Sequence, residues 1–203
     1  PILAPIFGGV VLEYSTWTMI FVVLAIIGMM MLITVKWALP ETLQTEKRTN
    51  TSIKRTIMTF IDLLKDRSFI GFAFVQGLMM AGMFAYISGT PFIFQGIYGV
   101  TPQTYSFLFA LNSVGLVIFT QITGRLAGRV REITLLFTGL MIASIASVVL
   151  LIMISMKLSL LFIVIPLFFV VSACGMTNTA SFSLAMQAQG HRAGSASALL
   201  GLL

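Results

Sequence analysis

Long apolar runs separated by short polar segments make up most of the chain. A helix needs roughly 20 apolar residues to cross about 30 Å of hydrocarbon, and the longer runs meet that requirement. They predict membrane-spanning helices over the ranges Trp17–Ala38, Ser68–Ile97, Thr104–Thr123, Ile133–Ser155 and Leu158–Met186. Apolar runs at residues 1–12 and 198–203 look like partial helices, so we expect the chain to be a fragment of a longer protein. The predicted fold class is all-α, a polytopic transmembrane helix bundle.

One long polar segment, residues 40–67, interrupts this pattern. Within it, apolar residues recur at three- and four-residue steps, at Ile53, Ile57, Phe60, Ile61 and Leu64. That spacing predicts an amphipathic helix that lies at the membrane surface.

Composition and charge support a membrane protein and orient it. Hydrophobic residues make up 58% of the chain and charged residues only 9%, with a mean hydropathy of +1.04, whereas soluble domains are about one-quarter charged. The formal net charge is +6, and of the 12 lysines and arginines only Lys157 falls on one side of the predicted helices. Basic residues collect in cytoplasmic loops, so segment 40–67 is expected to be cytoplasmic. The positive charge is thereby explained by orientation, and no nucleic-acid partner is expected.

The stretch 81–102 differs from a simple apolar span. It contains polar residues and helix breakers, namely Tyr86, Ser88, Thr90, Gln95, Gly82, Gly89 and Pro91. Such groups are tolerated at membrane depth where they face protein or a water-filled cavity. We therefore predict that this stretch lines a substrate path. Helical spacing places Gln76, Tyr86 and Thr90 near one stripe, and these are candidate substrate contacts.

Two amides, Asn112 and Gln121, fall in the next span and are expected to be buried. A buried amide costs free energy unless it is hydrogen-bonded. Asn112 either contacts substrate or bonds to a neighbouring helix, which is the commoner use of Asn in membranes.

No catalytic or metal-binding constellation is visible. His191 is the only histidine and Cys174 the only cysteine, and residues 68–122 contain no Asp, Glu, Lys, Arg or His. An intramembrane enzyme would need such groups at membrane depth, so we expect neither an enzyme nor a metal site. Among the residues present, Glu13 is the only candidate for proton coupling, and it is placed at the outer membrane edge, so the coupling residue is expected elsewhere.

Several motifs, taken in chain order, resemble the major facilitator superfamily. Residues 1–9, PILAPIFGG, resemble the end of its antiporter motif on the fifth helix, and residues 40–43, PETL, the end of its sixth helix. Residues 124–129, GRLAGR, resemble the second copy of its loop motif, with Gly128 where that motif usually has Asp. Residues 84–112 look like the seventh and eighth helices of the bicyclomycin-resistance branch of drug:proton antiporters, and residues 193–201 are similar to its eleventh helix.

The resemblance implies a partial major facilitator fold that runs from the late fifth to the early eleventh of twelve helices. Residues 1–39 would end the first six-helix half, residues 40–67 would form the central loop, and residues 68–203 would belong to the second half. It implies multidrug efflux by proton-coupled antiport with alternating access in the bacterial cytoplasmic membrane. The expected partners are small apolar or amphipathic drug-like substrates and membrane lipid, with the proton as coupling ion, no cofactor, and a monomeric full-length protein.

The resemblance also implies roles for individual residues, each beside a simpler alternative. Pro5, Gly8 and Gly9 fit a close-packed hinge between the halves, or ordinary glycine-rich packing. The loop residues Gly124, Arg125 and Arg129 fit contacts that lock the inward-closed state, or serve orientation alone. Because the tenth helix borders the cavity in this superfamily, Asn178 is a further candidate substrate contact. A proton symporter or a metabolite exporter of the same fold, and a non-transport assembly protein, remain alternatives.

Overall fold

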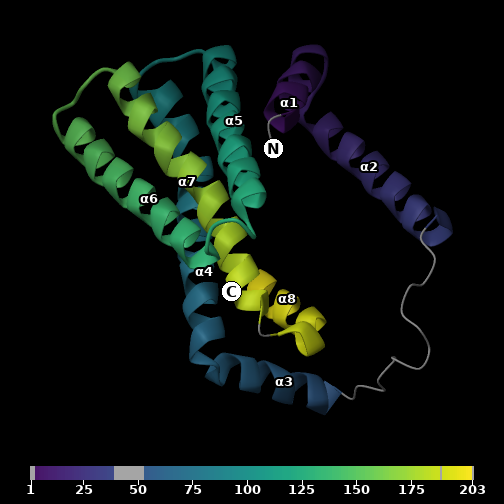
Figure 1. The fold of residues 1–203 in the computed structure, drawn as a ribbon. Helices are drawn as coiled ribbons and strands as arrows, with labels where there is room; N and C mark the ends of the chain where they lie inside the picture. Colours follow the sequence, from purple (N-terminus) through teal and green to yellow (C-terminus); the bar gives the residue numbers. More distant parts are fainter. Residues whose placement is uncertain (1–2, 39–52, 188, 203) are drawn as a thin grey trace.

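A computed structural model describes residues 3–38, 53–187 and 189–202 (Figure 1). The helices follow in the order α1 (Leu3–Tyr14), α2 (Trp17–Ala38), α3 (Ile53–Lys65), α4 (Arg67–Pro91), a π-helical turn (Phe92–Ile97), α5 (Pro102–Leu126), α6 (Glu132–Ser155), α7 (Leu160–Gln187), a 3-10 turn (Gly190–Arg192) and α8 (Ala193–Leu202). Apart from an isolated bridge between Ala127 and Val130, all regular structure in the described residues is helical. The prediction of an all-α bundle is confirmed.

Five of the described helical segments are long and apolar enough to cross a membrane, and they match the five predicted spans. The ends differ by a few residues for local reasons. Helix α5, for example, begins at Pro102 rather than Thr104. The Thr101 hydroxyl accepts a hydrogen bond from the Thr104 amide at 3.2 Å, and proline suits the first helical position.

The predicted breaks in α4 are only partly present. The α-helix continues through Gly82 and Gly89 and changes at Pro91, after which the chain widens into the π-helical turn. Proline cannot donate a backbone hydrogen bond and its ring crowds the preceding turn, whereas a glycine costs a helix only about 1 kcal/mol. Since an unpaired backbone group is costly in hydrocarbon, the glycines keep their helical bonds.

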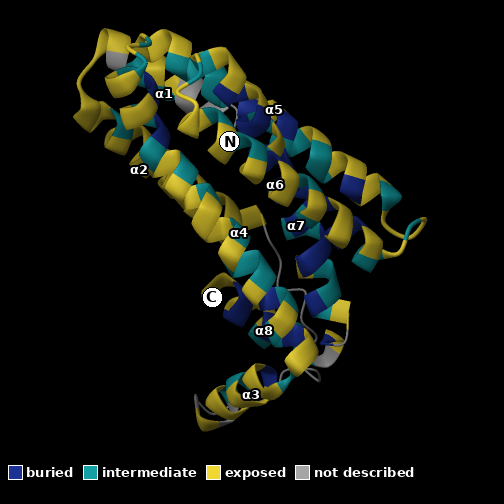
Figure 2. Ribbon diagram, turned by 90° about the vertical axis from the view of Figure 1, so that its left-hand side faces the viewer, coloured by how far each residue is buried: buried dark blue, intermediate teal, exposed yellow. Residues whose placement is uncertain are grey.

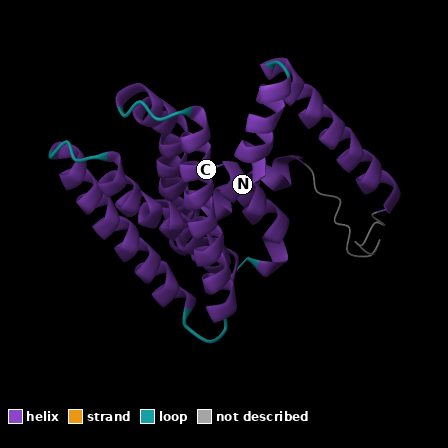
Figure 3. Cartoon of the chain, turned by 90° about the horizontal axis from the view of Figure 1, so that it is seen from above, coloured by secondary structure: helices purple, strands orange, loops and turns teal. Residues whose placement is uncertain are grey.

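The centre of the bundle is α7, which packs against α4, α5 and α6 (Figure 1). Figure 3 shows the grouped helices from above. Figure 2 shows the dark blue, buried residues of α7 between the more exposed neighbouring helices. Glycines allow the closest approaches. A Cβ atom added at Gly175 would lie 2.5 Å from the carbonyl oxygen of Leu116 on α5, and one at Gly139 would lie 2.7 Å from the hydroxyl oxygen of Thr177. The core is therefore built on backbone-close helix contacts.

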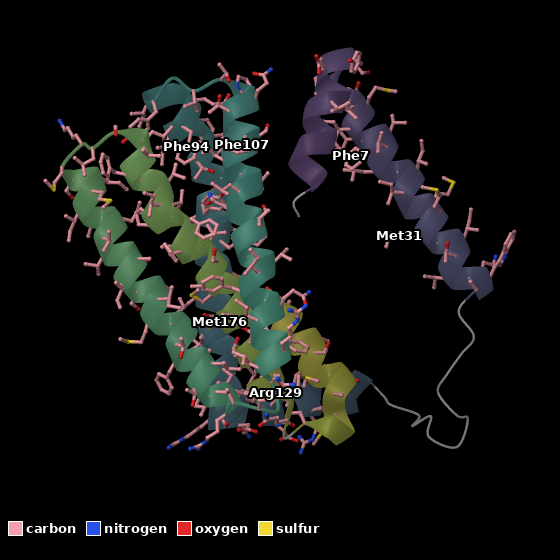
Figure 4. All side chains as sticks on the ribbon, turned by 45° about the horizontal axis from the view of Figure 1, so that its top comes forward. Phe7, Met31, Phe94, Phe107, Arg129 and Met176 are labelled. Carbon is pink, nitrogen blue, oxygen red and sulfur yellow. The ribbon has the colours of Figure 1, made fainter. Side chains whose placement is uncertain are left out.

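Helices α1 and α2 lie to one side of this bundle. α1 packs beside α5, and α2 contacts α1 (Figure 1). No residue of α2 is buried, and Met31 in its middle is 64% exposed (Figure 4). An exposed surface that is apolar on all sides suits a lipid or helix environment.

The predicted amphipathic helix is α3, which lies across the lower end of the bundle in Figure 1. Its Leu63 is 1% exposed and packs in a cluster with Phe69 of α4 and with Ala196 and Leu199 of α8. Between α3 and α4, Asp66 accepts hydrogen bonds from the amides of Ser68 at 3.0 Å and Phe69 at 3.3 Å. Its second carboxylate oxygen accepts one from the Gln189 side-chain amide at 2.9 Å. Asp66 therefore joins three segments.

Replacing Asp66 with Ala is expected to lower the free energy of unfolding by roughly 1–3 kcal/mol, because it removes a helix cap and a charged acceptor. Thermal unfolding of the purified protein in detergent measures the loss. The matched control is Asp62→Ala. The Asp62 side chain is 62% exposed and lies 3.8 Å from Arg192, so its loss should cost less than about 1 kcal/mol. Equal destabilisation by the two substitutions would contradict the capping role.

Candidate functional site

A polar pair joins α4 and α5 inside the bundle. The Asn112 side-chain amide donates a hydrogen bond to the Tyr86 hydroxyl oxygen at 3.0 Å, and Asn112 is only 1% exposed. The Tyr86 ring stacks on Phe109, with ring centroids 5.6 Å apart and planes inclined by 18°. Since Tyr86 is held by both its ring and its hydroxyl, the position of its side chain is well defined.

A second polar pair lies next to the first. The hydroxyls of Thr90 and Tyr105 share a hydrogen bond of 3.4 Å, and the Thr90 hydroxyl also donates to the Tyr86 carbonyl oxygen at 2.8 Å. The Tyr105 ring lies 6.1 Å from Phe109, centroid to centroid. We call Tyr86, Thr90, Tyr105, Phe109 and Asn112 the Tyr86 cluster. It is a row of hydroxyl and amide groups set among aromatic rings.

The Tyr86 cluster has unused hydrogen-bonding capacity. Among the described residues, the Asn112 carbonyl oxygen Oδ1 is buried and has no hydrogen-bond partner. A buried acceptor without a donor costs about 1–3 kcal/mol, so a ligand donor or a water molecule at this point would be stabilised. The cluster contains no acid and no base. It can orient a polar group of a ligand, and it offers no carboxylate or imidazole to carry a proton.

The sequence-predicted substrate contacts divide between two depths. Tyr86, Thr90 and Asn112 come together in the Tyr86 cluster. Gln76 lies ten residues before Tyr86, about 15 Å along α4. Asn178 lies on α7 two residues before Ala180, which packs near the same end of α4. Gln76 and Asn178 each have a buried side-chain oxygen without a hydrogen-bond partner among the described residues. They belong to the half of the bundle nearer α3.

The prediction that Gln121 is buried is wrong, since the residue is exposed. Asn112 faces the core of the bundle, and Gln121 follows it by nine residues. At 3.6 residues per turn, nine residues amount to two and a half turns, which puts Gln121 on the opposite side of α5.

A cleft of about 810 Å³ lies between parts of α1 and α5. Its walls include Gly8, Gly9 and Glu13 of α1, and Tyr105, Ser106 and Phe107 of α5. A Cβ atom added at Gly8 or Gly9 would meet no atom of another described residue within 4 Å. In the described part of the chain these glycines border open space, and their role in a hinge between the halves stays a prediction. Pro5 is a residue of α1, and the structure does not describe its side chain.

The sequence profile of the Major Facilitator Superfamily matches residues 1–203. The chain belongs to the major facilitator superfamily. It is 46% identical over 205 residues to the MFS-type transporter YdgK of Bacillus subtilis (strain 168), a match that covers 100% of the chain and 51% of that protein. It is 25% identical over 201 residues to the bicyclomycin resistance protein homolog of Haemophilus influenzae, covering 99% of the chain and 50% of that protein. The chain thus spans about half the length of these curated relatives.

Membership of the superfamily, together with five described helical segments long and apolar enough to cross a membrane, indicates a multi-pass membrane protein. The loop between α5 and α6, whose residues 124–129 resemble the superfamily's loop motif, has a glycine with a positive φ angle. Gly128 has φ +82°, a left-handed conformation that glycine adopts without the steric cost met by other residues. This geometry explains how the turn closes with glycine where the family pattern usually has Asp.

The basic residues of this loop are exposed. Gly124, Arg125 and Arg129 lie at the end of the bundle opposite the cleft, as Figure 4 shows for Arg129. Within the described residues, no carboxylate lies at ion-pair distance from Arg125 or Arg129. Their gating role stays a prediction. The nearby contact between the Gln187 side-chain amide and the Glu132 carboxylate, at 2.8 Å, ties the ends of α6 and α7 instead.

Two members of the Tyr86 cluster, Tyr105 and Phe109, were not predicted as site residues. Tyr105, Phe109 and Asn112 are separated by four and three residues, the spacing of a single helix face. This stripe on α5, taken with the stripe on α4, is the sequence signal that places both rings beside Asn112.

Proposed function

We propose that this chain forms part of a proton-coupled exporter of small apolar or amphipathic drug-like molecules. Two halves of the complete transporter would alternately open a central cavity to either side, with substrate bound near mid-bilayer. The observation that carries the proposal is the part-buried hydrogen bond between Tyr86 and the buried Asn112, whose acceptor oxygen Oδ1 has no partner among the described residues. The similarity to a bicyclomycin resistance protein homolog supports drug-like substrates and placement in that branch of the superfamily.

The Tyr86 cluster suits such substrates. Small-molecule sites are mostly apolar and aromatic, with a few polar groups that fix orientation. Here the rings of Tyr86, Tyr105 and Phe109 supply the apolar surface, and Asn112 and Thr90 supply the polar groups. A substrate that donates a hydrogen bond to Asn112 Oδ1 satisfies the unpartnered acceptor.

The deeper polar residues extend the same path. Gln76 and Asn178 each present an unpartnered buried oxygen in the half of the bundle nearer α3, so they would meet substrate in the inward-facing state. The Tyr86 cluster has no carboxylate to carry the coupling proton, so the coupling residue belongs outside this cluster. The proton is the coupling ion and no cofactor is needed.

Each segment of the chain is assigned to a part of the complete transporter. Residues 1–39 belong to the end of the first half, residues 40–67 to the central loop, and residues 68–203 to the second half. The Lys and Arg distribution supports a cytoplasmic position for α3 and the loop after α5, in the bacterial cytoplasmic membrane. The complete protein works as a monomer in contact with membrane lipid. The outer end opens and closes at a hinge formed by Pro5, Gly8 and Gly9. The cytoplasmic end is locked in its closed state by contacts of Gly124, Arg125 and Arg129.

A vesicle experiment tests the function. Inverted membrane vesicles that contain the complete transporter should accumulate a fluorescent amphipathic dye when their interior is acidic. Nigericin, which dissipates the pH gradient, should abolish this accumulation, and vesicles without the transporter provide the baseline. Accumulation that persists after the gradient is removed would overturn proton-coupled antiport. Dye release driven by the same gradient would favour the alternative of a proton symporter.

A further inference from the structure

The cleft between α1 and α5 contains an unused negative charge. Glu13 is its only lining residue that carries a full charge at neutral pH, among the residues the structure describes. No Lys or Arg of the described chain lies at ion-pair distance from it. The nearest basic residue along α5 is Arg125, which is about 33 Å from Gln103 at the rim of the cleft, at 1.5 Å per residue. The carboxylate is therefore available to a positively charged ligand.

The walls beside Glu13 suit the apolar body of such a ligand. Phe107 is 69% exposed and lines the α5 side, where Figure 4 labels it, and Val10 and Ala110 add further apolar surface. An aromatic face attracts a cation as well as apolar groups. Gly8 and Gly9 leave the α1 wall open, so the cleft keeps a volume of about 810 Å³, within the range of sites that hold drug-sized molecules.

Tyr105 connects the cleft to the Tyr86 cluster. Its side chain lines the cleft, its hydroxyl bonds to Thr90, and its ring lies beside Phe109. A molecule in the cleft is thus separated from the interior polar groups by a single side chain. Tyr105 therefore borders both the cleft and the Tyr86 cluster.

From these contacts we infer that the cleft is a binding subsite for amphipathic organic cations, with Glu13 as the residue that recognises the positive charge. The cationic group lies near the Glu13 carboxylate, and the apolar body lies against Val10, Phe107 and Ala110. The inference rests on the proposed function and narrows it, because it makes cations preferred over neutral molecules of the same size. Glu13 acts here as a selectivity residue, and coupling to protons is assigned to another group.

Equilibrium binding to the purified complete transporter, without a pH gradient, tests the subsite. The probes are tetraphenylphosphonium, a permanently charged aromatic cation, and triphenylphosphine oxide, a neutral aromatic molecule of similar shape. Glu13→Gln should weaken tetraphenylphosphonium binding roughly 2- to 5-fold, the range for a solvent-exposed charge pair. Binding of the neutral probe should change less than about twofold, and Glu13→Asp should retain most of the cation affinity.

The matched control is Glu132→Gln, which removes the same charge at the other end of the bundle and should leave the ratio of the two affinities unchanged. The inference is overturned if Glu13→Gln leaves cation binding unaltered, if it weakens both probes equally, or if the unmodified transporter shows no preference for the cation. Because binding is measured without a gradient, failure of proton-coupled transport in vesicles would overturn the proposed function separately.

Discussion

Replacing Gly175 with valine should prevent α5 and α7 from packing and remove most of the folded protein. A Cβ atom at this position would lie 2.5 Å from the Leu116 carbonyl oxygen and 2.6 Å from the Thr120 hydroxyl oxygen. The first of these is a backbone atom, so α5 itself would have to shift. Overpacking a core typically costs 1–3 kcal/mol per added group, and valine adds a branched side chain where a single methyl already collides, so we expect a loss of about 3 kcal/mol or more.

Fluorescence-detected size-exclusion chromatography and thermal unfolding in detergent would measure this loss. Gly82→Val is the matched control, because Gly82 also lies within a membrane-spanning helix and a Cβ atom there meets nothing within 4 Å. It should cost about 1 kcal/mol or less. If the two valine variants were equally stable, the close α5–α7 contact would not be what holds the bundle together.

The second large effect is expected on substrate binding. Asn112→Leu keeps a side chain of similar volume but removes both the donor to Tyr86 and the free acceptor Oδ1. Folding loses one hydrogen bond and no longer has to bury an unpaired oxygen, so the stability should change by about 1 kcal/mol or less. Substrate affinity should fall roughly tenfold, which corresponds to one hydrogen bond of about 1.4 kcal/mol.

Measuring the substrate Kd and the Tm of the same variant separates the two contributions. Ser113→Ala is a suitable control, because the Ser113 hydroxyl donates to the Phe109 carbonyl oxygen of its own helix at 3.0 Å and should matter little for binding. A double-mutant cycle with Tyr86→Phe should give a coupling of roughly 1 kcal/mol if Tyr86 and Asn112 act as a pair. Strictly additive effects, or a large loss of stability with unchanged affinity, would show that Asn112 serves packing alone.

The membrane spans could be predicted from the sequence because the thickness of the bilayer dictates how long an apolar run must be. The helix breaks could not be predicted from glycine content. In water, Gly82 and Gly89 would favour an interruption, but in hydrocarbon every backbone group needs a partner and the helix continues. Only Pro91, which lacks the backbone donor, alters the geometry, so the chemistry of the missing N–H decided where α4 changes.

The candidate site was predictable in its residue types and less so in its geometry. Helical periodicity assigns a direction to a side chain and does not limit how far a stripe extends along the helix. Gln76 and Thr90 share a direction but are about 21 Å apart along α4, so they do not meet one small ligand. The bond between Tyr86 and Asn112 depends on how far α4 and α5 are shifted relative to each other, and that shift is set by tertiary packing.

The central position of α7 has a consequence for biosynthesis. Helices α4, α5 and α6 all pack on α7, so during synthesis they lack their common partner until the ribosome has added residues 160–187. Helices α4, α5 and α6 can therefore dock on α7 only after α7 has entered the lipid, in the order of insertion followed by association. Three of its hydroxyls fit that sequence of events, whereas the buried Thr177 hydroxyl has no hydrogen-bond partner among the described residues. Ser172, Thr179 and Ser181 donate to carbonyl oxygens four residues earlier in the same helix, so α7 can be inserted with these polar groups already paired.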